Sequence, residues 1–375
     1  MSKKSSKFFI CLYAILILSF SVLLFAIPKN EFSPTENRML SDFPKLSADS
    51  VIDGSFMKKF SSFCCDHFPL RNTLLAIDSS SELALGKLEA DSVMIGKNNN
   101  LIKRLEYNDF STLRHNLEAI ENLRSFANEN TANFVFFCAP RSVDVLTDFC
   151  PFPFEGGRCG NIWNEIGSAV TVTNLLSQKA TSGEYVFYKT DHHWTTLGAY
   201  YAYSVLGRYL GYTPFPLSDF RIEEASDCFY GSTYASAIIL GASPDSIFAM
   251  RYEGDEKITV TDSSTKKVGG LYDYSALKGS SKYDFFLGGN KARLRIENGD
   301  KPTLILIKDS FANSIAPFLS RHYNIELIDP RYLREPLESL LSNLYRGKEK
   351  PPLLILAGID TLASTSFFRN SKTTG

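Results

Sequence analysis

The first twenty-seven residues carry the strongest hydrophobic signal of the chain. Three lysines within the first seven residues precede an uncharged apolar run from Phe8 to Ile27. Twenty residues at the helical rise span the hydrocarbon core of a bilayer. Because the lysines come first, the positive-inside rule predicts a cytoplasmic N-terminus and export of everything after Pro28. Leu24 and Ala26 match a signal-peptidase site poorly, which favours an uncleaved anchor over a cleaved signal peptide.

Helical periodicity recurs in three later segments. Residues 56–77 carry apolar positions at helical spacing around a break at Pro69. Residues 110–128 place Leu113, Leu117, Ile120 and Leu123 on one stripe, which predicts an amphipathic helix. Residues 196–210 resume the periodicity, with Thr195 or Thr196 as the cap.

Short apolar runs predict the strands. These are Asn133–Ala139, Tyr185–Tyr188, Thr303–Ile307, Ile325–Ile328 and Leu353–Ala357. The last three are nearly all aliphatic, the pattern of a parallel sheet covered on both faces. Candidate helices at 311–321 and 335–345 lie between them, so the order is typical of a doubly wound α/β fold.

The domain organisation follows from these patterns. We expect a cytoplasmic tip and transmembrane anchor over residues 1–30, a helical and loop extension over 31–130, and an α/β domain over 131–375. Residues 215–300 are rich in Gly and Ser, and their pattern predicts short strands and two hairpins. We therefore expect an irregular β-rich insertion there.

Composition narrows the function classes. A net charge of −1 over 375 residues argues against nucleic acid as the main partner, because phosphate binding needs a basic excess. Six of the seven cysteines follow the apolar run, and Cys150 with Cys159 is the pair we expect to form a disulfide, with buried free thiols as the alternative. No Cys/His spacing suggests zinc.

The first candidate for chemistry is Ser310. The sequence TLILIKDSFANS places this serine on the turn after a predicted strand, above the carboxyl edge of the sheet. Amides at the start of the next helix could stabilise an oxyanion there. A plain N-cap serine is the competing interpretation.

The second candidate is the run Asp191-His192-His193-Trp194. A serine hydroxyl needs an adjacent base, and that base must be oriented. In an extended segment residues i and i+2 project to the same side, so Asp191 would orient His193 while His192 points away. A structural histidine pair and a metal site are the alternatives.

The run TDHHWTTLGAYYAY resembles the signature of the DHHW family, which is similar to the SGNH-like alginate O-acetyltransferases. Further matching stretches are Glu36–Leu40 (ENRML), Asp66–Asn72 (DHFPLRN), Phe229–Ser232 (FYGS), Ile307–Phe318 and Ile328–Tyr332. The resemblance implies an SGNH-hydrolase-like domain, circularly permuted so that Asp-x-His precedes Ser. It gives the triad roles to Asp191, His193 and Ser310, with no cofactor and no metal.

The oxyanion and substrate residues have weaker candidates. No GxND block supplies the usual oxyanion Asn, so Asn290 in a Gly-rich turn and the backbone amide of Gly358 are the candidates. Arg331 follows a late strand and either lines the cleft or pairs with Asp329. Trp194, from the signature itself, is a further candidate for substrate contact.

The function expected is an extracytoplasmic serine acyltransferase that O-acetylates a cell-surface polysaccharide from a single-pass membrane anchor. The resemblance implies a multipass membrane acyltransferase as the source of the acetyl group. A carbohydrate acetylesterase is the alternative within enzymes. The alternative outside the enzymes is a non-catalytic protein that binds glycan and assists envelope assembly.

Overall fold

The computed structural model describes residues 3–33, 38–104, 107, 109–152, 160–279, 281–347 and 350–368. The chain divides into two compact units, Met1–Asp91 with Tyr234–Gly241, and Ser92–Thr233 with Ala242–Gly375. The helix at Ser111–Glu129 packs into the core of the second unit.

The first unit is mostly helical. Its elements are α1 (Lys3–Ala26), β1 (Phe32–Ser33), β2 (Arg38–Met39), α2 (Ala48–Ile52), α3 (Ser55–Asp66), α4 (Arg71–Ala84) and β3 (Glu89–Ala90). Within α1, the 20-residue span Lys7–Ala26 is long and apolar enough to cross a membrane, with a mean hydropathy of 2.7 over an 18-residue window. The break between α3 and α4 contains Pro69 as predicted, since proline removes a helical donor and restricts the residue before it.

The second unit contains most of the strands. They are β4 (Val93–Ile95), β5 (Leu101–Lys103), β6 (Phe134–Ala139), β7 (Arg221–Phe229), β8 (Asp245–Arg251), β9 (Thr259–Asp262), β10 (Val268–Gly269), β11 (Arg293–Glu297), β12 (Thr303–Lys308), β13 (Asn324–Ile328) and β14 (Leu353–Gly358).

Its α-helices are α5 (Ser111–Glu129), α6 (Ser142–Val145), α7 (Gly160–Ile166), α8 (Thr173–Thr181), α9 (Thr196–Leu210), α11 (Ala316–Leu319), α12 (Leu337–Leu344) and α13 (Ile359–Ser364); α10 (Ser232–Ala237) crosses the boundary between the units. The 3₁₀ turns are η1 (Lys97–Asn99), η2 (Thr147–Phe149), η3 (Leu217–Asp219), η4 (Asp255–Lys257), η5 (Ala276–Lys278), η6 (Lys282–Phe285) and η7 (Ser310–Asn313).

A seven-stranded sheet in the order β10-β9-β11-β13-β12-β14-β6 organises the second unit. Strands β13, β12, β14 and β6 are parallel neighbours, whereas β11, β9 and β10 extend the sheet by antiparallel pairing. The chain runs from β12 to β13 on one side and then returns to β14 on the other side. The carboxyl end of β12 is therefore a topological switch point, where open α/β sheets bind ligands.

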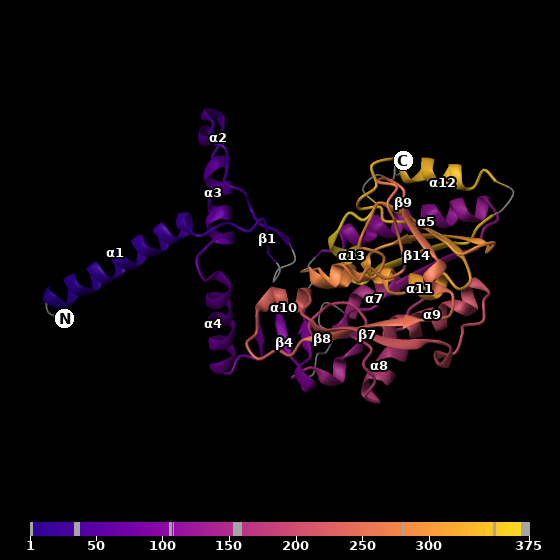
Figure 1. Cartoon of the computed structure of the whole chain (residues 1–375), viewed down its shortest axis with the longest axis horizontal. Helices are drawn as coiled ribbons and strands as arrows, with labels where there is room; N and C mark the ends of the chain where they lie inside the picture. The colour runs from indigo at the N-terminus through magenta and orange to yellow at the C-terminus, as the bar shows by residue number, and fades with distance from the viewer. Residues whose placement is uncertain are drawn as a thin grey trace. The chain divides into compact units, whose positions relative to one another are not determined.

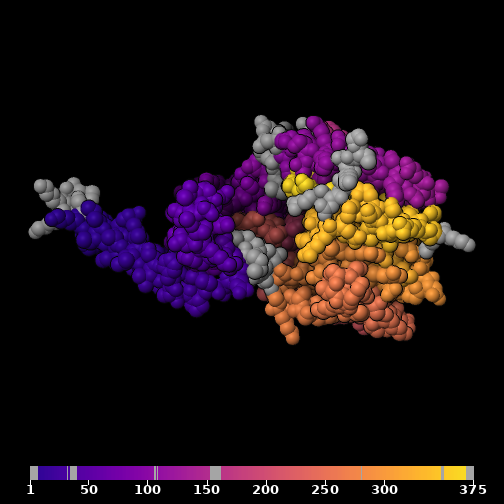
Figure 2. Space-filling model, turned by 90° about the horizontal axis from the view of Figure 1, so that it is seen from above, coloured from indigo at the N-terminus to yellow at the C-terminus, as the bar shows by residue number. Residues whose placement is uncertain are grey.

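Helices cover both faces of this sheet (Figure 1). One face packs Leu304, Leu306 and their neighbours against α8, α9 and α11, and the other packs Ile305 and Ile307 against α5, α12 and α13. Successive residues of β12 thus enter opposite cores, which is why the strand is aliphatic throughout. Figure 2 shows purple residues of α5 beside yellow C-terminal residues, in agreement with the edge-to-face contact of Phe126 and Tyr345 at 5.4 Å.

Most elements expected from the sequence are confirmed, among them α5, α9, β6 and the three late parallel strands. One expectation is wrong. Tyr185–Tyr188 contains an isolated bridge from Phe187 to Trp194 rather than a strand, because this segment folds back on the DHHW run. In the region 215–300, β7 and β8 form their own pair, whereas β9, β10 and β11 join the main sheet.

Two sequence features fall wholly or partly outside the described residues. Cys159 lies there, so its disulfide with Cys150 stays a prediction. Of the ENRML stretch, Glu36 and Asn37 lie there as well.

Candidate active site

Ser310 lies at the switch point of the sheet. Strand β12 ends at Lys308, and the Asp309 side chain caps the following turn η7 by accepting the N–H of Phe311 at 3.0 Å. The other Asp309 oxygen accepts the N–H of Gly358 at 2.7 Å and the hydroxyl of Thr361 at 2.7 Å. Asp309 therefore ties the end of β12 to the end of β14, and it fixes the backbone that carries Ser310.

Three side chains form a continuous hydrogen-bonded chain. His193 Nε2 lies 2.7 Å from Ser310 Oγ, and His193 Nδ1 lies 2.5 Å from Asp191 Oδ1. Asp191 and His193 are buried, at 4% exposed each, while Ser310 is half-buried. This is the geometry of a nucleophile, a base and a group that orients the base. The structure thus brings together the three residues that the sequence proposed, although His193 and Ser310 are 117 residues apart in the chain.

The second oxygen of Asp191 is also held. Oδ2 accepts the N–H of Ser232 at 2.8 Å and its hydroxyl at 3.0 Å. The preceding residue is glycine for a steric reason, since a Cβ at Gly231 would lie 2.1 Å from Asp191 Cβ. In the sequence, this FYGS stretch stands out only by its resemblance to the family pattern. Its function as the support of Asp191 depends on a contact over 41 residues, which no local pattern reveals.

Electrostatics favour the ionised form of Asp191. Burial alone would raise the pKa of this carboxyl, but His192, His193, the hydrogen bond from His193 and the Ser232 amide outweigh burial. They hold the pKa of Asp191 well below its usual range. The aspartate is therefore charged whenever the site operates, and it can stabilise an imidazolium at His193.

Aromatic side chains fix the plane of the base. The Tyr283 ring stacks on His193 at 4.0 Å and 8°, and Phe311 lies 4.9 Å away on a tilted plane. The Tyr283 hydroxyl donates to Ser314 Oγ at 3.2 Å. Tyr283 was not identified from the sequence, because a lone Tyr in an irregular segment carries no signal of its place beside the histidine.

The DHHW run is bent rather than extended. The His193 N–H donates to Asp191 Oδ1 at 3.0 Å, which closes a turn in addition to the side-chain contact. His192 does not point away as expected. Its ring lies 3.8 Å from that of His193, and its Nδ1 lies 2.6 Å from Ser232 Oγ. Burial and the neighbouring His193 lower the pKa of His192 to about 4.

The same cluster must be considered as a metal centre. Ligand atoms of Asp191, His192 and His193 lie within 4.8 Å of one another. Both ring nitrogens of His193 already have protein partners, Asp191 and Ser310. A metal ligated by His193 would displace one of these bonds, so the arrangement fits acid–base chemistry better than ligation.

Behind the turn lies a buried cation. Lys308 is fully buried, and its Nζ donates to Asn290 Oδ1 at 2.8 Å and Asn313 Oδ1 at 2.7 Å. Its Nζ also lies 3.7 Å from Asp329, which in turn pairs with Arg331 at 2.7 Å. Burial lowers the pKa of Lys308 to about 8 against the opposing effect of Asp329. Asn290 and Arg331 thus belong to a network that fixes the ends of β12 and β13.

The two remaining substrate candidates also have protein partners. The N–H of Gly358 is directed at Asp309, so it is not presented to an oxyanion at Ser310. Trp194 is fully buried, and its Nε1 donates to Ser314 Oγ at 3.0 Å and the Phe311 carbonyl at 3.2 Å. Its place is in the packing under η7 and not in contact with substrate. The N–H of Ser310 itself starts η7, where the first amides lack intrahelical acceptors.

Comparison with known proteins supports the motif-based resemblance. A family model described as DHHW protein matches residues 164–328, a stretch that contains Asp191, His193 and Ser310. The resemblance to the DHHW family is therefore confirmed over that stretch. No curated protein matches the chain.

Solved structures show the same fold. A DHHW family protein from Eubacterium siraeum superposes with a TM-score of 0.59 at 18% identity, covering 76% of this chain and 98% of that chain. Bacillus cereus PatB1 with a sulfonyl adduct gives 0.58 at 17% identity, covering 75% and 100%. The O-acetyltransferase domain of Pseudomonas putida AlgJ gives 0.45 at 14% identity, covering 73% and 93%. At these identities the first two establish the fold alone.

Proposed function

We propose that this chain is a serine acyltransferase of the DHHW type, in which Ser310 is the nucleophile, His193 the base and Asp191 the group that orients the base. The observation that carries the proposal is the hydrogen-bonded chain from Asp191 through His193 to Ser310 at the switch point of the sheet.

The chemistry proceeds in two displacements. His193 Nε2 takes the proton of Ser310 Oγ as that oxygen attacks the acyl carbon of the donor, and the imidazolium then protonates the leaving alcohol. An acceptor hydroxyl next gives its proton to His193 and attacks the acyl-enzyme. The proton returns to Ser310 Oγ as the ester bond to the serine breaks, so the triad is regenerated.

Charge develops on the acyl oxygen in both displacements. The Ser310 N–H belongs to the same residue as the nucleophile and starts η7, where the first amides lack acceptors within the helix, so we assign it as an oxyanion donor. Asp191 supplies the second stabilisation, because its charge favours the imidazolium that forms on His193.

The resemblance extends the proposal to location and substrate. Helix α1 would anchor the chain in the membrane, with the second unit outside the cytoplasm. The acceptor would be a hydroxyl of a cell-surface polysaccharide, and a multipass membrane acyltransferase would supply the acetyl group. The order Asp191, His193, Ser310 along the chain supports a circularly permuted SGNH-like arrangement.

An acetylesterase uses the same triad, so the test must compare two acceptors. The full-length chain in detergent is given an activated acetyl ester with and without oligosaccharides, and acetylated sugar and free acetate are both measured. Water is present at about 55 M, so transfer to sugar requires a site that holds the acceptor near attack geometry. We expect transfer to exceed hydrolysis for at least one glycan. Hydrolysis of acetylated glycans with no transfer across a panel would make the chain an esterase.

A non-catalytic glycan-binding protein is the remaining alternative. It would bind oligosaccharide but would neither release acetate nor lose an activity on Ser310→Ala substitution. Turnover that disappears in the Ser310→Ala variant excludes it.

A further inference from the structure

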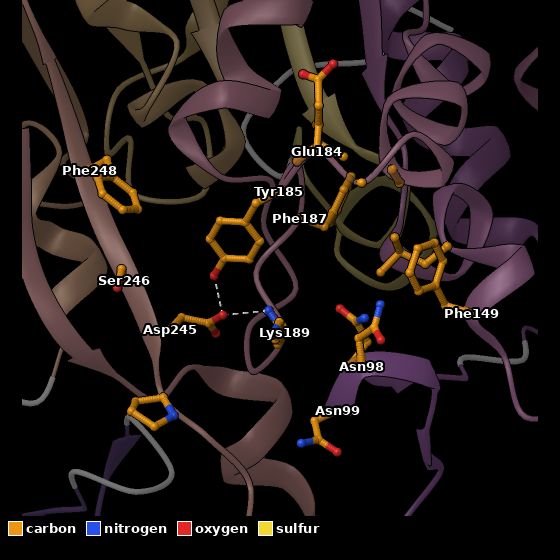
Figure 3. Close-up of a pocket in the computed structure, with 16 residues that line it drawn as sticks. Asn98, Asn99, Phe149, Glu184, Tyr185, Phe187, Lys189, Asp245, Ser246 and Phe248 are labelled. Atoms are coloured by element: carbon orange, nitrogen blue, oxygen red, sulfur yellow. Dashed lines mark hydrogen bonds between the residues drawn. The ribbon is translucent and has the colours of Figure 1, made fainter. Parts of the chain in front are cut away.

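A cavity of about 690 Å³ lies in the second unit beside the segment that leads into the triad (Figure 3). Its walls come from the η1 turn, the segment Gly183–Lys189 and the start of β8. None of the triad residues lines it. Its volume falls within the ~300–1,000 Å³ of typical small-molecule sites.

The η1 turn presents two amide side chains to this cavity. Asn98 and Asn99 both have a φ of 59°, a left-handed conformation that is uncommon for residues other than glycine and least costly for Asn. Both are exposed, and neither side chain makes a hydrogen bond within the described residues. The turn is rigid despite its conformation, because Gly96 N–H bonds the Asn100 carbonyl and Leu101 N–H bonds the Lys189 carbonyl, each at 2.8 Å. A fixed pair of free amides is suited to hydroxyl groups, which both donate and accept.

The other walls combine aromatic and acidic groups. Phe149 and Phe248 are half-buried and offer ring surface to the cavity. Glu184 and Asp245 also line it, with Lys189 as the one cation among the lining residues. Both carboxylates already have protein partners, since Glu184 pairs with Lys179 at 2.8 Å and Asp245 is buried and accepts the Lys189 and Thr190 N–H groups. Aromatic faces pack against the C–H faces of sugar rings, and amides bind their hydroxyls. The lining therefore offers no excess of positive charge to an anionic ligand.

One of these carboxylates also holds the triad loop. Asp245 accepts the hydroxyl of Tyr185 and the N–H of Lys189 at 2.8 Å (Figure 3). It also accepts the N–H of Thr190 at 2.8 Å. The next residue is Asp191. A ligand in the cavity would therefore lie against the segment whose position sets the triad acid.

We propose that this cavity is a subsite for a neutral sugar unit of the acceptor glycan. The Asn98 and Asn99 amides would bind its hydroxyls, and the Phe149 and Phe248 rings would pack against its C–H faces. That the bound glycan is the acyl acceptor rests on the proposed function, but sugar binding to the cavity can be tested without turnover. A neutral sugar is favoured over a uronate or phosphate because Lys189 is the one cation among the lining residues, while the free polar side chains of the η1 turn are uncharged amides.

The test is direct binding to the full-length Ser310→Ala chain in detergent. Chitotriose and cellotriose serve as neutral probes and trigalacturonate as the anionic probe, with dissociation constants from saturation-transfer NMR titration. The double variant Asn98→Gly/Asn99→Gly removes both amides yet tolerates the left-handed backbone. The matched control is Thr131→Gly, an exposed residue of the second unit with a φ of 54° that lies outside the cavity.

We expect a neutral probe to bind, and the double variant to weaken that binding at least about tenfold while Thr131→Gly leaves it unchanged. Ser246→Tyr, which fills the cavity from β8, provides a second variant should the double variant fail to fold. Binding of trigalacturonate alone overturns the inference, since a separate basic cavity lined by Lys266, Lys291, Arg293 and Arg334 would explain it. Neutral binding that survives both cavity variants overturns it as well.

Failure of this inference differs from failure of the proposed function. If the cavity variants lose binding of the neutral probe and Ser310 is unreactive, the sugar subsite is supported and the proposed acyltransferase activity is contradicted. If acyl transfer to sugars proceeds equally well in the cavity variants, the acyltransferase activity is supported and the sugar subsite is contradicted.

Discussion

The close approach of Gly231 to Asp191 predicts how much activity an alanine at position 231 would cost. In Gly231→Ala the new Cβ would lie 2.1 Å from Asp191 Cβ, 2.4 Å from Oδ2 and 2.6 Å from Cγ, while ordinary contact starts at 3.4 Å. The two Cβ atoms must separate by 3.4 − 2.1 = 1.3 Å. A displacement of about 1 Å in a catalytic group costs on the order of 10²-fold in rate, or about 2.7 kcal/mol of activation free energy.

The assay is acetate release from a chromogenic acetyl ester, with thermal unfolding measured in parallel. We expect kcat to fall by about 10²-fold in Gly231→Ala with a modest loss of Tm. The matched control is Gly270→Ala, because a Cβ at Gly270 meets nothing within 4 Å and the residue has no left-handed backbone. A Gly231→Ala enzyme within twofold of the wild type would refute the role of this contact in holding Asp191.

Three further predictions follow from the site and the fold. His193→Ala should be nearly inactive while His192→Ala keeps substantial turnover, since His193 alone bridges Asp191 and the serine; equal losses together with sensitivity to a chelator would indicate a metal site. A reporter enzyme that functions only outside the cytoplasm should be active when it is fused after residue 375. Activity of a fused reporter that functions only in the cytoplasm would contradict the proposed orientation. Burial and neighbouring cations lower the pKa of His322 to about 4, below the ~6.5 of an unfolded chain. As the pH falls from about 6.5 towards 4, the unfolded chain therefore binds a proton that the folded chain does not. The contribution of the neutral His322 to the free energy of unfolding is thus full at pH 7 and is lost over that range. The decrease in Tm from pH 7 to pH 4.5 should therefore be smaller in His322→Gln, which keeps an acceptor for the Tyr203 hydroxyl; an unchanged decrease would show that His322 is not the titrating group.

The sequence predicted the parts of the fold that depend on local pattern. The aliphatic runs of β12, β13 and β14 require burial on both faces, so their parallel pairing could be expected without knowledge of their neighbours. Ser310 was identified for the same reason, because the carboxyl end of such a strand is where this sheet type binds ligands. The expectation that His193 lies beside Asp191 agrees with the geometry, but the expected reason, an extended segment, does not. The two residues share a bent turn, and the Asp191 carboxylate selects His193 through both its backbone and its ring.

What the sequence did not predict depends on long-range contacts. The pairing of β9 and β11 with the main sheet joins residues whose own pattern is short and irregular. Ser232 and Tyr283 approach Asp191 and His193 from distant segments, and neither carries a local signal. Trp194 was considered for substrate contact because it belongs to the signature, yet its indole is needed beneath η7.

The central claim is that Ser310 is the nucleophile that carries the acyl group, and trapping the covalent intermediate tests it most directly. The full-length chain is treated with an activated acetyl ester or a sulfonyl fluoride, digested and examined by mass spectrometry. The account predicts a single adduct on the Ser310 peptide, strongly reduced in His193→Ala and absent in Ser310→Ala, with turnover in Ser310→Ala lower by about 10⁴-fold or more. An adduct on another residue, or an active Ser310→Ala enzyme, would contradict it.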